Sequence, residues 1–136
     1  MYQQMIFVNL AVNDLEASKK FFTELGFALN EQFSDDSTAS VVISDAIVLM
    51  IMKKERFGQF TKKQIADSSQ TVEALLALSA ESRQKVDELV DKAIGSGGAP
   101  VGETQEQGDF MYGRAFFDPD GHHFEVVWMD PSVIEG

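Results

Sequence analysis

The sequence predicts an α+β fold made of two βαβββ modules in one domain. The order strand, helix, strand, strand, strand reads twice along the chain, and the two halves overlay at an offset of 68 residues, which carries Val12 onto Ala80. A repeat of this length indicates two supersecondary units, each too small to bury its own sheet face alone. We expect module one over residues 4–53, a connecting loop over 54–71 and module two over 72–130.

Module one begins with alternating apolar residues over 5–12, a pattern typical of a strand with one buried face. A helix is predicted next, because Asn13 and Glu16 have capping-box spacing and Gly26 stands where a helix often ends. Three further strands are predicted over residues 27–33, 38–44 and 46–53, with turn residues between them.

The connecting loop is polar, and Thr61 with Gln64 predicts the cap of one short helical turn through Asp67. Module two then opens with a strand over residues 72–79. The clearest helical spacing in the chain follows, at Val86, Leu89, Val90, Ala93 and Ile94. Short strands around Val101 and over residues 110–117 and 122–129 complete this module.

The composition excludes several classes of protein. The 136 residues suffice for one compact core and are too few for two independent domains. A net charge of −11, from 11 basic and 22 acidic residues, argues against a nucleic-acid partner, because binding a polyanion requires concentrated Lys and Arg. The absence of cysteine excludes disulfides, thiolate metal sites and cysteine nucleophiles.

Neither a membrane span nor a leader peptide is predicted. The longest apolar run, residues 46–52, is too short to cross a bilayer. Residues 1–4 lack the basic start of a signal peptide. We therefore expect a cytoplasmic protein without a membrane partner.

Two segments resemble signatures of the vicinal-oxygen-chelate superfamily, which holds glyoxalase I, bleomycin-resistance proteins and extradiol dioxygenases. Residues 12–27 read VNDLEASKKFFTELGF, and residues 113–128 read GRAFFDPDGHHFEVVW. The resemblance covers nearly the whole chain and is weakest over residues 54–71. It implies that the two modules pair to form a curved mixed sheet around a cup, and that the protein is a homodimer.

Enzymes of this superfamily hold a divalent metal with four side chains. The resemblance places those four positions at Phe7, Leu49, Leu75 and Glu125. Three of them are hydrocarbon and cannot ligate, so we expect no metal cofactor. Register shifts of two residues keep the same sheet face and leave a second set open, namely Asn9, Glu73, His123 and Glu125. A divalent metal held by that set stays an alternative.

The expected cup is mostly apolar, which is typical of a small-molecule site. Its candidate lining is Phe7, Asn9, Leu49, Ile51, Leu75, Tyr112, Arg114, His123 and Val127, with Glu125 among them. The function this predicts is the binding of a small, largely apolar molecule. In one alternative Glu125 is a general base, or part of an unorthodox metal set, in a lyase, isomerase or dioxygenase. In another, Glu125 has only a structural role, and Arg114 or Tyr112 makes the hydrogen bonds that its carboxylate needs.

Five of the 11 basic residues fall within residues 53–63. The simpler interpretation is a solvated loop that balances an acidic body. The second is a mobile lid in which Lys53, Lys54 and Arg56, with Phe57 or Phe60, close over an anionic ligand. The lid hypothesis predicts that neutralising the three cations weakens the binding of anions.

Overall fold

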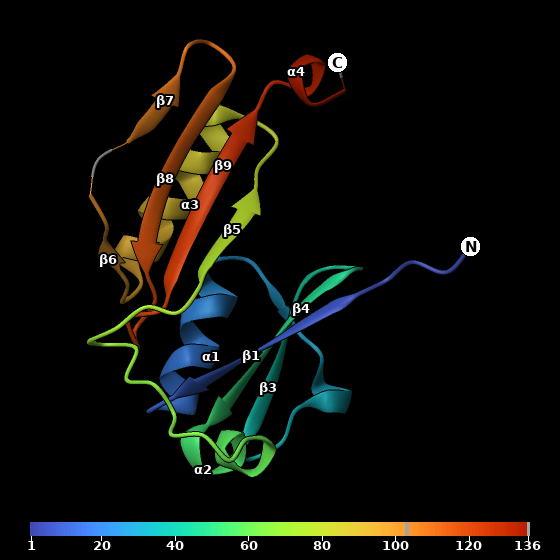
Figure 1. Ribbon diagram of the computed structural model, residues 1–136, viewed down its shortest axis with the longest axis vertical. Coiled ribbons are helices and arrows are strands. Elements are labelled where there is room, and N and C mark those ends of the chain that lie inside the picture. The colour runs from blue at the N-terminus through green and yellow to red at the C-terminus, as the bar shows by residue number, and fades with distance from the viewer. Residues whose placement is uncertain (103, 136) are drawn as a thin grey trace. The chain divides into compact units, whose positions relative to one another are not determined.

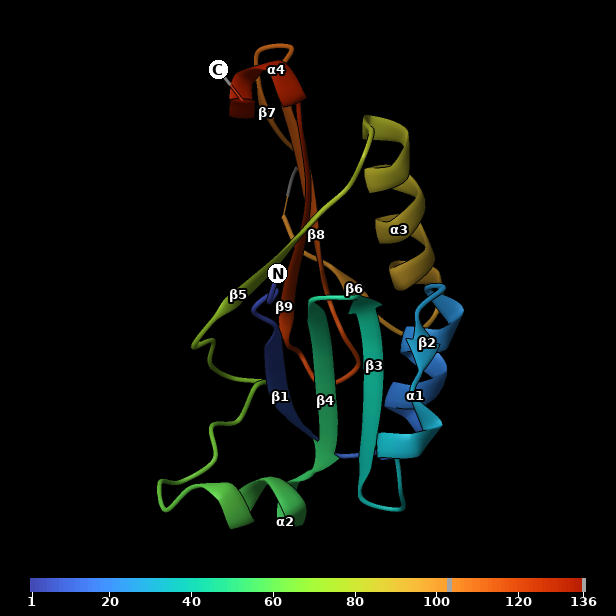
Figure 2. The same cartoon turned by 90° about the vertical axis from the view of Figure 1, so that its right-hand side faces the viewer.

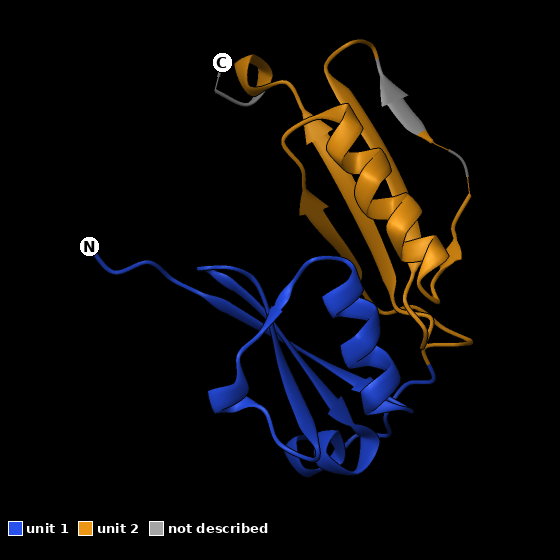
Figure 3. Ribbon diagram, turned by 180° about the vertical axis from the view of Figure 1, so that it is seen from behind, with its two compact units in different colours: residues 1–67 blue, residues 68–136 orange. Residues whose placement is uncertain are grey.

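The computed structural model describes residues 1–102 and 104–135. The chain divides into two compact units, with the boundary between Asp67 and Ser68 (Figure 3). Figure 1 labels the elements in chain order. Within the described residues, no helix is both long enough and apolar enough to cross a membrane.

The first unit holds one four-stranded sheet and one long helix. Its elements are β1 (Ile6–Val12), α1 (Leu15–Glu24), β2 (Ala28–Leu29), the 3₁₀ turn η1 (Glu31–Phe33), β3 (Thr38–Ser44), β4 (Ile47–Lys53), α2 (Lys54–Phe57) and the 3₁₀ turn η2 (Gly58–Phe60). The strand order is β1-β4-β3-β2. Strands β1 and β4 run parallel and the other pairs are antiparallel.

The second unit repeats this arrangement. Its elements are β5 (Leu75–Ser79), α3 (Arg83–Gly95), β6 (Ala99–Pro100), β7 (Gln105–Gln107), β8 (Met111–Phe117), β9 (His123–Met129) and α4 (Pro131–Glu135). The strand order is β5-β9-β8-β6, and β7 adds a further pairing to β8. The offset of 68 carries Leu15, the first residue of α1, onto Arg83, the first residue of α3. The predicted α+β class with two βαβββ modules is confirmed.

In each unit, one side of the sheet forms the core. Helix α1 packs against β3 and β4, and α3 packs against β8 and β9 (Figure 2). In unit two, Phe116 stacks on Phe124 with ring centroids 5.2 Å apart, and both are buried. Val86 and Val90 of α3 are likewise fully buried, as the helical spacing predicts.

Three local predictions are wrong. The cap of α1 is Asp14, whose carboxylate accepts the Ala17 amide at 3.1 Å, so the helix starts one residue later than expected. Thr61 begins no helical turn, because its hydroxyl accepts the Lys63 amide in a tighter local turn. The strand expected over residues 27–33 is cut short, since the Asn30 side chain accepts the Gln32 amide and starts η1.

Candidate functional site

The sheet of unit two has one face that α3 does not cover. Side chains of paired residues point to the same face, so the register of β9 with its neighbours defines that surface. The open face carries His123, Glu125 and Val127 from β9. Their partners on the same face are Leu75, Ala77 and Ser79 of β5, and Gly113, Ala115 and Phe117 of β8.

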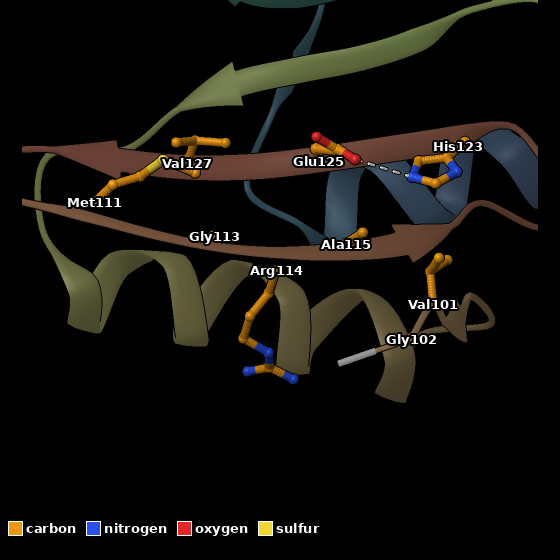
Figure 4. A pocket seen from close by; sticks show the side chains of 9 residues that line it. All are labelled: Val101, Gly102, Met111, Gly113, Arg114, Ala115, His123, Glu125 and Val127. Atoms are coloured by element: carbon orange, nitrogen blue, oxygen red, sulfur yellow. Dashed lines mark ion pairs between the residues drawn. The ribbon is translucent and has the colours of Figure 1, made fainter. Parts of the chain in front are cut away.

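A pocket of about 160 Å³ lies on this face. Its lining consists of Val101, Gly102, Met111, Gly113, Arg114, Ala115, His123, Glu125 and Val127 (Figure 4). Most of these residues are small or apolar, and His123 and Glu125 supply side-chain polar groups on the open face. Such a lining is typical of a small-molecule site.

His123 and Glu125 form the polar end of the pocket. Nε2 of His123 lies 3.3 Å from Oε2 of Glu125, and the two side chains are 15% and 29% exposed. The Nε2 atom is buried and makes no hydrogen bond. The rings of Phe117 and His123 pack edge to face, with centroids 5.5 Å apart. The pair therefore presents an unsatisfied polar atom beside a carboxylate.

The polar ends of Tyr112 and Arg114 are held toward α3; Arg114 still contributes to the pocket lining, whereas Tyr112 does not. The Tyr112 hydroxyl donates to Oδ1 of Asp87 at 2.6 Å, and Nη1 of Arg114 lies 2.9 Å from the same oxygen and 2.9 Å from Asp91. Both acids are on α3. Figure 4 shows the guanidinium of Arg114 pointing toward that helix, away from Glu125. The alternative in which Arg114 or Tyr112 satisfies Glu125 is therefore wrong.

The same network shifts the ionisation equilibria of Asp87 and Tyr112. The hydrogen bond from Tyr112, aided by Arg114, holds the pKa of Asp87 below its usual range despite partial burial. The hydrogen bond to Asp87 in turn raises the pKa of Tyr112. The hydrogen bonds and ion pairs that cause these shifts hold α3 against the sheet, on the face opposite His123 and Glu125.

In unit one, Phe7 and Asn9 lie on one face of β1, in register with Val48 and Met50 of β4. Leu49 is in register with Val8 and belongs to the other face, as does Ile51. Leu49 and Ile51 are 2% and 0% exposed, whereas Phe7 is 54% exposed. The prediction that these three side chains share one lining is wrong, because Leu49 and Ile51 are core residues.

The predicted lid residues Lys53, Lys54, Arg56, Phe57 and Phe60 run through the end of β4, α2 and η2. Nη1 of Arg56 donates to Gln59 at 2.6 Å, and its guanidinium lies 4.8 Å from the centroid of Phe60. Two hollows flank the segment, one lined by Asn9, Phe57, Phe60 and Thr61 and the other by Asp35, Ser37, Lys53, Glu55, Arg56 and Gln59. Aromatic rings and cations therefore line different hollows, and closure over an anion stays a prediction.

The turn before β9 holds His123 in position. The buried Asp118 carboxylate accepts the amides of Asp120 and His122 at 3.0 and 2.8 Å, and its other oxygen lies 2.7 Å from Nδ1 of His122. Burial lowers the pKa of His122, but the hydrogen bond and charge of Asp118, with the charge of Asp120, outweigh it and raise that pKa. Ser68 donates its hydroxyl to the Asp120 carbonyl at 2.6 Å and braces the turn.

The family model of the Glyoxalase/Bleomycin resistance protein/Dioxygenase superfamily matches residues 4–126 of the chain. The chain belongs to this superfamily. Among curated proteins, none matches the chain significantly.

Several solved structures share the fold. The hypothetical protein SA1046 from S. aureus is 31% identical, with 94% of each chain covered and a TM-score of 0.77. A glyoxalase/bleomycin resistance protein/dioxygenase family enzyme from Burkholderia phytofirmans PsJN is 19% identical over 93% of this chain and 99% of its own, with a TM-score of 0.76. The fosfomycin resistance protein FosX from Listeria monocytogenes is 19% identical over 94% of each chain, with a TM-score of 0.68.

The donor atoms of this superfamily member do not fit the four-ligand metal set that the resemblance implies. Three positions of that set are hydrocarbon, so Glu125 is its single oxygen ligand. Across residues 1–102 and 104–135, no group of three or more His, Asp or Glu could hold a metal ion. Of the shifted set, His123 and Glu125 lie together, whereas Glu73 is absent from the lining of their pocket.

The sequence interpretation missed part of the lining, namely Val101, Gly102, Met111, Gly113 and Ala115. One signal for it was available. Gly113 interrupts an otherwise bulky strand, and a glycine inside a strand often marks a close approach of a ligand or of another backbone. Val101 and Gly102 follow β6 and carry no comparable signal.

Proposed function

We propose that this superfamily member binds a small, largely apolar molecule, without a metal ion, in the pocket on the open face of unit two. The observation that carries the proposal is the pocket itself, in which Met111, Val127 and Val101 give apolar walls and His123 with Glu125 gives one polar end. Apolar walls supply affinity through desolvation, and a few polar groups fix orientation.

A thermal-shift screen of small uncharged molecules tests the proposal, with Gly113→Val as the blocking variant. A β-carbon on Gly113 would lie 3.6 Å from Val126 O and 3.6 Å from Val127 Cγ2, which are ordinary contacts. A β-carbon is therefore accommodated, and we expect the methyl groups of valine to fill the pocket. We expect ligands that raise the Tm of the wild type to lose their effect in Gly113→Val.

The matched control is Gly95→Ala, at the end of α3, where an added β-carbon meets open space. Ligand-induced shifts in this variant should equal those of the wild type. Ligands that shift the wild type and Gly113→Val equally would show that they bind elsewhere and would refute the proposal.

We also propose that the protein is a homodimer. The outer strand β1 is hydrogen-bonded to one neighbour within the described residues, and Ile6 and Phe7 on it are 56% and 54% exposed. An apolar outer strand favours association with a second chain. Light scattering coupled to size exclusion should give twice the mass of 15.1 kDa, and Phe7→Asp should lower it. A monomer at all concentrations would overturn this second proposal.

A further inference from the structure

We infer that the ligand of this pocket is a single-ring molecule that carries an O–H or N–H donor and no negative charge. The inference rests on the proposed function and adds the chemical class of the ligand. Three properties of the pocket support it, namely its size, an unsatisfied polar atom and the sign of the charge that lines it.

The pocket has room for one ring. Its volume is about 160 Å³, and an apolar cavity of about 150 Å³ is known to hold benzene. Met111 lies among the apolar walls. A thioether makes favourable contacts with aromatic rings, so the wall chemistry suits an aromatic ring better than a chain of similar volume.

The polar end suits a hydrogen-bond donor, because the Glu125 carboxylate is an acceptor when ionised. Nε2 of His123 is buried without a hydrogen bond and lies 3.3 Å from Oε2 of Glu125. A buried polar atom without a partner is destabilising, and a carboxylate is an acceptor when ionised. An O–H or N–H group of the ligand can donate to the carboxylate, or to the imidazole when Nε2 carries no proton. A ligand that offers only acceptors would leave the Glu125 carboxylate unpaired.

Charge disfavours an anionic ligand, because the cation in the lining, Arg114, is already paired. The guanidinium of Arg114 is held by Asp87 and Asp91, at 2.9 Å from each, on the far face of the sheet. Within the described lining no other Lys or Arg is present, and Glu125 is acidic. The chain as a whole carries a net charge of −11, which also repels anions. The donor therefore belongs to a neutral hydroxyl or to a protonated amine.

Four one-ring probes separate these possibilities, namely phenol, benzylamine, benzene and benzoate. Each is titrated into the ¹⁵N-labelled full chain, and the amide shifts of residues 111–117 and 123–129 are followed. We expect phenol and benzylamine to bind about 5- to 10-fold more tightly than benzene, the effect of one hydrogen bond. Benzoate should bind more weakly than benzene.

Two variants assign the donor contact. His123→Phe keeps a ring at that position and should lower the affinity for phenol to that for benzene, while benzene itself binds unchanged. Glu125→Gln removes the carboxylate charge and should weaken benzylamine more than phenol. Circular dichroism and Tm establish that each variant is folded. If His123→Phe does not fold, Glu125→Gln alone tests the donor contact.

The outcomes distinguish this inference from the proposed function. Equal affinities for phenol and benzene, or tight binding of benzoate, would overturn the inference. The inference would also be overturned if only larger molecules bound to the protein. In that case the proposed function would still stand, provided that Gly113→Val abolished their binding. If no compound loses affinity in Gly113→Val relative to Gly95→Ala, the inference and the proposed function both fail.

Discussion

Nδ1 of His122 lies 2.7 Å from Oδ2 of Asp118, a carboxylate whose side chain is fully buried. The contact joins the two ends of the turn that leads into β9. Asp118 also accepts two backbone amides of the same turn, at 3.0 and 2.8 Å. The position of the turn, and of His123 just after it, therefore depends on the charge of these two groups.

The stability of the protein should depend on pH through His122. Its pKa is raised in the folded state above the ordinary value of 6.5. The protonated form is thus favoured by folding, so its contribution is fully present below about pH 6.5 and is lost as the pH rises through the raised pKa. Urea unfolding between pH 5.5 and 8.5 measures this loss.

His122→Gln is the control for that titration, because glutamine cannot be protonated in this range. We expect its free energy of unfolding to change less between these pH values than that of the wild type. An identical pH dependence in the two proteins would show that protonation of His122 does not contribute to the pH dependence of stability.

Gly121→Ala should destabilise the same turn by about 2–3 kcal/mol. Gly121 has a φ of +89°, and a β-carbon there would lie 2.5 Å from the carbonyl oxygen of Ser68. Both the backbone conformation and the contact with another backbone segment oppose the substitution. Urea unfolding measures the change, and Gly95→Ala, which meets open space, serves as the matched control. Equal stability of the two variants would contradict the geometry of the turn.

Leu49→Ala should cost about 2–5 kcal/mol, because it removes a side chain from the core of unit one. Phe7→Ala should change the free energy of unfolding of the monomer by about 0.5 kcal/mol or less, since Phe7 is 54% exposed and Leu49 only 2%. Urea unfolding at low protein concentration compares the two variants. A larger loss of unfolding free energy for Phe7→Ala than for Leu49→Ala would contradict the core position of Leu49 and favour its predicted place in a pocket.

Tyr112→Phe should lower the free energy of unfolding by about 1 kcal/mol, as expected for one hydrogen bond to a partly exposed carboxylate. The bonded state holds the pKa of Asp87 below its ordinary value of 3.8. The associated stability is present above that value and is lost as the pH falls through the lowered pKa. Acid unfolding of Tyr112→Phe should therefore begin at a higher pH than that of the wild type.

The same variant should leave ligand affinity unchanged, because Tyr112 lies on the α3 face and the pocket lies on the other. Titration of any ligand found in the screen compares Tyr112→Phe with the wild type. A loss of affinity would place Tyr112 in the binding site after all.

Protein purified without chelators should contain no stoichiometric Zn, Ni, Mn or Fe. The physical reason is the donor set, because hydrocarbon side chains occupy three of the four ligand positions that the superfamily resemblance implies. Elemental analysis of the wild type and of Glu125→Ala tests this. A metal retained by the wild type and lost in Glu125→Ala would overturn the metal-free proposal.

Much of the fold could be predicted from the sequence because its signals are local. The helical spacing that includes Val86 and Val90 corresponds to α3, and Gly26 and the segment 118–121 mark turns at positive-φ glycines. The two-residue alternation along 122–129 also predicts that His123 and Glu125 share a face, and the structure places them 3.3 Å apart.

The lining in unit one could not be predicted, because β4 gives no alternation to read. The strand sequence is IVLMIMK, and as an inner strand it is apolar on both faces. Whether a residue of β4 shares a sheet face with Phe7 depends on the register between β1 and β4, two segments about 40 residues apart in the chain. A slip of one residue exchanges the two faces, so the place of Leu49 was undetermined.

The sequence by itself determined the repeat, the superfamily, the turn before β9 and the common face of His123 and Glu125. Only the tertiary structure decided that Tyr112 and Arg114 turn toward α3, that Leu49 and Ile51 are core, and that Gly113 lines a pocket. The difference is physical. Turns, caps and alternation depend on neighbours along the chain, whereas a pocket depends on strand register and on which sheet face a helix covers.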